Sequence, residues 1–197
     1  MELLDRLVGV VVRPIPTFRV MVENPCLTNA FFIVISASVC ASLASLIATP
    51  RAAQVTLAPE FLRLLYSPEF IVPVGVVAGV LFWIIFGTIL HGFSKLLGGK
   101  GKVNQTLLVY GFSEVPALYS VAFGMLSWIL ASQLPYQIGS ILLGLWSLIL
   151  LVLGLREAHK FSTLRAISAI VLPIVIIIII VVVILLAVLL PIMMWGV

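Results

Sequence analysis

Glu114 is the ionisable residue of this 197-residue chain that lies well inside a long apolar stretch. It follows Gln105, where that stretch begins, by nine positions, which is roughly 14 Å along a helix and about half of a bilayer core. A charged carboxylate at this depth costs on the order of 2.5–3.5 kcal/mol, so it should be protonated, paired or hydrated. Glu114 therefore marks either a proton or substrate site or a structural polar contact.

Two interactions are predicted for Glu114, and the sequence leaves both open. His91, near the end of the preceding apolar stretch, would pair with Glu114 if the two stretches pack side by side. Alternatively, Pro116 has no N–H to donate to the carbonyl of Phe112. Protonated Glu114, or Ser113, would then donate the missing hydrogen bond.

The same residues argue against an enzyme. Gly111-Phe112-Ser113 resembles the start of a serine-nucleophile turn, but Glu114 stands where the second glycine is needed and no histidine shares that depth. His91, His159 and Glu114 have no recognised metal-ligand spacing. We therefore predict no catalytic residue, no metal and no cofactor.

Composition places the chain in a membrane. It is 63% hydrophobic and 9% charged, whereas a soluble domain has about 45–50% apolar and about 25% charged residues. This excludes a soluble enzyme, and 11 Lys and Arg are too few for an ordinary nucleic-acid binder. A membrane-spanning helix needs about 20 mostly apolar residues. Five stretches qualify and predict an all-α integral membrane protein with one domain over residues 27–197: residues 27–48, 70–93, 105–131, 137–155 and 167–193.

The distribution of basic residues predicts the orientation. Nine Lys and Arg fall on the N-terminal side of the membrane and two on the other side, when alternate connecting segments are added together. Cytoplasmic segments retain Lys and Arg. We expect a cytoplasmic N-terminus and a C-terminus that is outside or lumenal.

Three segments carry further expectations. In residues 1–26, apolar side chains at helical spacing from Leu3 to Val11 predict a short amphipathic helix in the cytoplasmic interface. Pro14 and Pro16 should end it and begin an extended link to the first span. Residues 59–66 resemble a second interfacial helix, and residues 174–190, which lack polar side chains, should form a lipid-facing wall.

Small residues mark the helix-packing faces. Gly75 and Gly79 are four residues apart in the second span, and the same stripe continues to Gly87. This spacing allows close approach of helix backbones, either within one bundle or across a homodimer. In the third span, Gly111 and Pro116 flank Glu114 and should loosen the helix there.

Two connecting segments predicted to be cytoplasmic are basic. One is glycine-rich and the other has mixed charge, and either could hold an anionic lipid headgroup or a protein partner. The alternative is a pair of tight turns that obey the charge rule for cytoplasmic loops. The candidate binding residues are Lys95, Lys100 and Lys102 in the first segment and Arg156, His159 and Lys160 in the second.

Short motifs resemble the Yip-domain family, five-span membrane proteins named for interacting with Ypt/Rab GTPases. They are the segments 13–18 (RPIPTF), 98–101 (GGKG) with Gln105-Thr106, Gly111-Phe112 with Pro116, 154–155 (GL), and 159–162 (HKFS) with Arg165-Ala166. The resemblance implies a five-helix bundle linked to vesicle trafficking and membrane shaping. With 26 residues before its first span, the chain resembles a minimal or prokaryotic-type member.

Two functional hypotheses follow. The first is a non-enzymatic membrane scaffold that recruits lipid or protein through its basic loops and forms a bundle or a homo-oligomer. The second is a small transporter, channel or lipid-moving protein built around Glu114. The expected location is the cell membrane of a prokaryote or the ER and Golgi membranes of a eukaryote, with no nucleic-acid partner.

Overall fold

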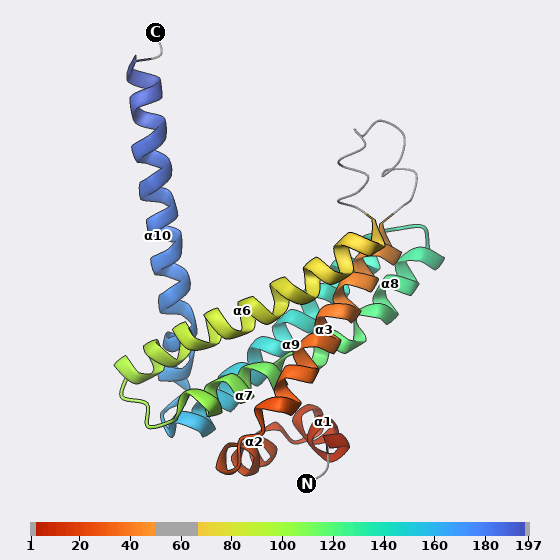
Figure 1. The fold of residues 1–197 in the computed structure, drawn as a ribbon, viewed down its shortest axis with the longest axis vertical. Coiled ribbons are helices and arrows are strands. Elements are labelled where there is room, and N and C mark those ends of the chain that lie inside the picture. Colours follow the sequence, from red (N-terminus) through yellow and green to blue (C-terminus); the bar gives the residue numbers. More distant parts are fainter. Residues whose placement is uncertain (1–2, 50–66, 196–197) are drawn as a thin grey trace.

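The computed structural model describes residues 3–49 and 67–195, and no strand occurs in these two ranges (Figure 1). The predicted helix over residues 59–66 lies outside the described residues. The elements are α1 (Leu3–Val12), α2 (Pro14–Glu23), α3 (Leu27–Ala48), α6 (Pro68–Leu96), α7 (Val103–Ser113), the 3₁₀ helix η1 (Val115–Tyr119), α8 (Ser120–Ile129), α9 (Leu134–His159) and α10 (Thr163–Trp195).

Within residues 3–49 and 67–195, five helical stretches are long and apolar enough to cross a membrane, at the positions that the sequence predicts. Three of them, α6, α9 and α10, are longer than predicted. Helix α6 continues to Leu96 and α9 continues to His159, so Lys95, Arg156 and His159 lie on helix ends and not in loops. The apolar run ends earlier than the helix does, because basic side chains are favourable in the last turn of a helix.

Small residues bring the helices of the bundle together. A Cβ atom on Gly111 would lie 2.8 Å from Cβ of Ala30 on α3, and one on Gly124 would lie 2.8 Å from the carbonyl oxygen of Ala44 on α3. Gly75 and Gly79 of α6 lie against the hydroxyl groups of Ser42 and Ser38 on α3.

Gly87 of α6 faces Leu107 of α7 in the same way, 2.6 Å from the position of a Cβ to Cδ2 of Leu107. The glycine stripe of α6 therefore packs inside one chain, the first of the two alternatives that the sequence leaves open. A homo-oligomer through another face stays a prediction.

The third span is not one continuous α-helix. Helix α7 ends at Ser113, η1 follows, and α8 begins at Ser120. Pro116 cannot donate to the carbonyl of Phe112, and the chain turns more tightly instead, with Ala117 N–H donating to Glu114 O at 2.9 Å. Glu114 thus sits at the junction of two helical segments.

The N-terminal segment differs from the expectation. A helix occupies Leu3–Val12, but the predicted extended link is wrong, because a second helix begins at Pro14. Proline is well accommodated in the first turn of a helix, where its missing N–H would have no partner anyway. Phe18 and Met21 of α2 are buried in the same core as the spans. The position of α1 in a membrane interface stays a prediction.

Helix α10 stands apart from the other helices over most of its length (Figure 1). Its lower end packs against α6 and α9, where Ala166, Ala169 and Ile170 are buried. The side chains of Ile174–Leu186 are exposed. Their exposure agrees with the predicted lipid-facing wall.

Candidate functional site

Thr106 lies between two histidines at one end of the bundle. Its Oγ1 is 3.0 Å from Nδ1 of His91 on α6 and 2.9 Å from Nε2 of His159 on α9. A hydroxyl group can donate to one ring nitrogen and accept from the other. These three residues, which we call the histidine cluster, join the ends of α6, α7 and α9.

His159 is the most enclosed member of the histidine cluster, with 0% of its surface exposed. Its ring stacks on Phe161 with a centroid distance of 5.4 Å, and Gly99 lies directly against Nδ1. The backbone N–H of Lys100 donates to the carbonyl of His159 at 3.1 Å. His159 is therefore an internal packing and hydrogen-bonding residue and does not face the surface where the sequence analysis expected it.

Polar contacts also attach α2 to this end of the bundle. The side-chain amide of Gln105 donates to the carbonyl of Val22 at 2.7 Å. Arg19 forms an ion pair with the buried Glu157 at 3.1 Å, and Arg156 lies 3.4 Å from the same carboxylate. Arg156 is thus engaged within the chain, which leaves fewer free cations here than the sequence analysis expected.

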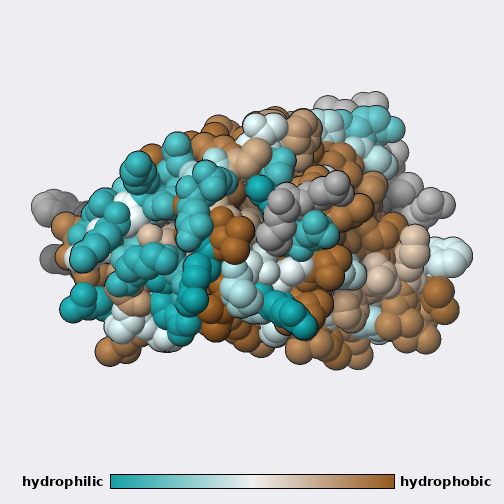
Figure 2. Space-filling view, turned by 90° about the horizontal axis from the view of Figure 1, so that it is seen from below, coloured by the Kyte–Doolittle hydropathy of each residue, from teal (hydrophilic) through white to brown (hydrophobic). Residues whose placement is uncertain are grey.

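The exposed basic residues gather on the same end, which we call the basic end: Arg13, Arg19, Lys95, Lys100, Lys102, Lys160 and Arg165. Figure 2, which views the molecule from below, shows hydrophilic side chains covering much of this face beside apolar ones. Leu96 and Leu164 are 81% and 73% exposed next to these cations. The surface therefore combines positive charge with protruding aliphatic side chains.

Lys160 has a strained position on the basic end. Its backbone is left-handed, with φ 54° and ψ 42°, directly after the last residue of α9. Glycine is the usual residue at such a helix end, and a side chain there costs roughly 1–2 kcal/mol. Burial acts to raise the pKa of the Glu157 carboxyl group, but Arg19, Arg156 and Lys160 together lower it, so the charge of Lys160 acts within the chain.

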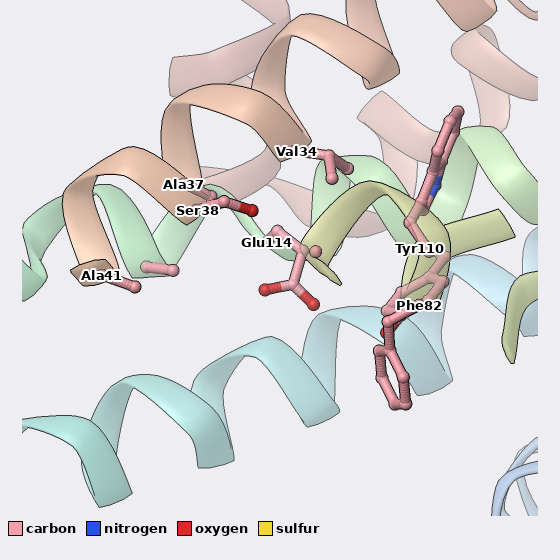
Figure 3. Close-up of a pocket in the computed structure, with 10 residues that line it drawn as sticks. Val34, Ala37, Ser38, Ala41, Phe82, Tyr110 and Glu114 are labelled. Atoms are coloured by element: carbon pink, nitrogen blue, oxygen red, sulfur yellow. The ribbon is translucent and has the colours of Figure 1, made fainter. Parts of the chain in front are cut away.

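A pocket surrounds Glu114 in the middle of the bundle (Figure 3). Its volume is about 280 Å³, and it lies between α3, α6 and the α7–η1 junction. The carboxyl group points into the space between Ser38 on one side and Tyr110 and Phe82 on the other. We call this space the Glu114 pocket; it is lined by Val34, Ala37, Ser38, Ala41, Gly79, Phe82, Trp83, Tyr110, Glu114 and Ala117.

Close helix contacts bound the Glu114 pocket on two sides. Toward the basic end, the indole N–H of Trp83 donates to the carbonyl of Leu107 at 2.9 Å and fixes α6 to α7. Toward the other end, Ser42 lies against Gly75 and holds α3 to α6. The pocket is thus a gap between packed helices, with Glu114 as its acidic group.

The structure does not bring the predicted polar residues together. His91 lies beside Thr106, eight residues before Glu114, or about 12 Å along the helix, so the proposed His91–Glu114 pair is absent. Ser113 donates to the carbonyl of Val109 at 2.8 Å and not to that of Phe112. Among the described residues, the carboxyl group of Glu114 has no hydrogen-bond or ion-pair partner.

Two site residues were missed by the sequence analysis. Tyr110 lines the pocket, and its position one helical turn before Glu114 was a usable signal. Thr106 was noted within a motif, but its partners come from helices 15 and 53 residues away. No spacing in the sequence indicates that meeting.

A family model described as the Yip1 domain matches residues 8–193. The chain belongs to the Yip1 family. It is therefore a multi-pass membrane protein of a family linked to membrane trafficking, and the described part of the chain has five helices suited to span the bilayer. No curated protein and no solved structure matches the chain.

Two of the motifs that carry the Yip resemblance meet at the histidine cluster. Gly99 and Gly101 lie against His159 and Ala158, and Thr106 bonds His159. Phe18 and Gly154 also come together, with Cε1 of Phe18 3.3 Å from the position of a Gly154 Cβ. The motifs of this Yip1 family member thus build the joint between its helices.

Proposed function

We propose that this chain is a non-enzymatic membrane-organising protein whose basic end binds anionic lipid headgroups. The observation that carries the proposal is the surface where exposed Lys95, Lys100, Lys102 and Lys160 adjoin exposed Leu96 and Leu164. Aliphatic side chains beside lysines suit a bilayer surface, because the apolar parts enter the lipid while the ammonium groups stay at the phosphates.

The predicted orientation supports a lipid surface on the cytoplasmic side. The cytoplasmic leaflet carries the anionic lipids, and each nearby Lys or Arg contributes about 1 kcal/mol of attraction. A cytoplasmic protein that binds the same lysines is the alternative outcome.

Lipid retention tests the proposal. The triple variant Lys100→Ala, Lys102→Ala, Lys160→Ala should lose about tenfold or more of the phosphatidylserine that co-purifies from mixed liposomes, given about 1 kcal/mol per lysine. Native mass spectrometry counts the retained lipids. The triple Lys→Arg variant is the matched control and should retain them.

A single variant separates lipid binding from folding. Lys160→Gly should raise the unfolding temperature, because it relieves the left-handed strain, and should still lower lipid retention. If all variants retain the same amount of lipid and the alanine variant loses a co-purifying protein, the basic end binds a protein partner and not lipid. Unchanged lipid and unchanged protein would refute recruitment altogether.

A second candidate function, movement of a small solute or lipid, is favoured by the Glu114 pocket. An unpartnered carboxyl group at a break between helical segments is an arrangement found along substrate pathways in membranes. Flux of protons, cations or labelled lipid in sealed proteoliposomes, abolished by Glu114→Gln, would support it. Equal leak in protein-containing and empty liposomes would exclude it for those solutes.

A further inference from the structure

The Glu114 pocket lies at the depth of the hydrocarbon core. Ser38 on α3 and Glu114 both follow the start of their helix at the basic end by 11 residues, which is roughly 17 Å along the axis and about half of a 30 Å core. The counts along α3 and along the third span therefore give the same depth for the pocket. A ligand of this pocket would be reached from within the bilayer.

The outer side of the pocket faces the surroundings of the bundle. Phe82 is 58% exposed, and Ala41 on the opposite helix is also exposed. At mid-membrane depth these side chains face lipid tails. The pocket can thus receive a molecule that is dissolved in the membrane, with the tail left among the lipids and the polar group directed at Glu114.

The chemistry of the lining favours a cation. Glu114 is the acidic group in the pocket, and the aromatic residues Phe82, Trp83 and Tyr110 share the space with it. Aromatic faces attract ammonium groups, and a carboxylate supplies the opposite charge. Both features act on the same ligand group, whereas an anionic group would be repelled by the carboxylate.

The size of the pocket limits the ligand. Its volume of about 280 Å³ lies just below the usual range for small-molecule sites, about 300–1,000 Å³. A pocket of this size can hold an amino group with several methylenes. A phosphodiester would place a negative charge beside Glu114.

We propose that the Glu114 pocket binds the amino group of a single-chain amphipathic amine, with Glu114 as its counter-ion and Phe82, Trp83 and Tyr110 around it. The ligand's tail leaves between Phe82 and Ala41 into the lipid. This site deepens the second candidate function by naming its ligand class. It requires neither flux nor the basic end, since binding alone is measured below.

Photo-crosslinking tests the site in the full chain. The probe is a dodecylamine with a diazirine beside the amine and a terminal alkyne, added to protein in phosphatidylcholine nanodiscs. We expect saturable adducts within residues 34–41 and 79–83, mapped by peptide mass spectrometry. Unlabelled dodecylamine should suppress them, and dodecanol should need about tenfold more, because it has no charge for the carboxylate or the rings.

Variants assign the binding to the pocket. Glu114→Gln should lower adduct yield about tenfold by removing the charge-assisted contact, while Glu69→Gln, on the exposed first turn of α6, should label like wild type. Ala41→Leu keeps the carboxyl group and blocks the pocket mouth, so it should also reduce labelling. Thermal unfolding of each variant confirms that it is folded.

Three results would overturn the proposal. Equal suppression by dodecanol and dodecylamine would assign the site to hydroxyl-bearing lipids. Full labelling of folded Glu114→Gln and Ala41→Leu proteins would show that the amine does not bind in the pocket. Adducts confined to other helices would show the same. If labelling behaves as expected and no flux is found, transport fails while the amine site stands.

Discussion

Two polar regions on the same span differ in how their polar groups are satisfied. In the histidine cluster, Thr106 lies within hydrogen-bond distance of both His91 and His159. Eight residues further, the carboxyl group of Glu114 has no hydrogen-bond partner among the described residues and faces a pocket. The hydroxyl group of Thr106 therefore connects three helices, whereas the carboxyl group of Glu114 is left facing a pocket.

The glycines near the two regions differ in the same way. At the histidine cluster, Gly99 and Gly101 lie against the backbone of Ser94 and Ala158, atoms that cannot yield without moving a helix end. At the pocket, Gly79 lies against the hydroxyl group of Ser38, the end of a side chain that can rotate. The histidine cluster is therefore a rigid joint between helices, and the Glu114 pocket retains free volume.

The largest effect is expected from Gly101→Ala at the joint. A Cβ there would lie 2.7 Å from the carbonyl oxygen and 3.1 Å from the carbonyl carbon of Ala158. Overpacking of this kind costs about 1–3 kcal/mol, and the upper end applies because backbone must move. Reversible unfolding in mixed detergent micelles measures the loss.

Gly144→Ala is the control for that substitution. Nothing lies within 4 Å of a Cβ at Gly144 in the middle of α9, so the change should stabilise the helix by up to about 1 kcal/mol. Equal effects of the two substitutions would show that the joint is not tightly packed. The distinction between rigid joint and open pocket would then fail.

An intermediate effect is expected from Thr106→Val. This nearly isosteric change leaves His91 Nδ1 and His159 Nε2 without the hydroxyl group that both contact. Unpaired buried polar groups cost about 1–3 kcal/mol. The same unfolding experiment measures it, and amide hydrogen exchange at residues 97–102 should accelerate.

The matched control is Thr88→Val on the exposed side of α6. Its hydroxyl group donates within the helix to the carbonyl of Ile84 at 2.7 Å, and that carbonyl belongs to the helix ladder in any case. The expected change is within about 0.5 kcal/mol. A loss at Thr88 that matches the loss at Thr106 would contradict the special role of the histidine cluster.

The sequence allows the membrane elements to be predicted more fully than the polar contacts. Hydropathy indicates all five spans, because burial in lipid requires an unbroken apolar run. Helix ends are less predictable: Pro14 begins a helix where a break was expected, since proline fits both situations. Whether a side chain is enclosed depends on other helices, which is why His159 was expected on the surface and lies buried.

The candidate site also has features that the sequence predicts and features that it does not. A departure from regular helix near Glu114 could be predicted in the weaker form of a loosened helix, because it depends on the local Pro116. The neighbours of Glu114 could not be predicted, since Ser38 and Trp83 come from helices whose rotation the sequence leaves open. The pairing of His91 with Thr106, and not with Glu114, is a difference of two helical turns that hydropathy does not resolve.

The smallest effect on folding is expected from Glu114→Gln. The carboxyl group has no hydrogen-bond or ion-pair partner among the described residues, so exchanging it for a neutral group of the same shape should change the free energy of unfolding by no more than about 0.5 kcal/mol. A loss above about 2 kcal/mol would instead place Glu114 with the histidine cluster, as a joint within the bundle. Added dodecylamine sharpens the contrast. At a hundred times its dissociation constant it should stabilise the wild type by about 2.7 kcal/mol, while the glutamine variant, which lacks the counter-ion, should show a much smaller shift at the same concentration.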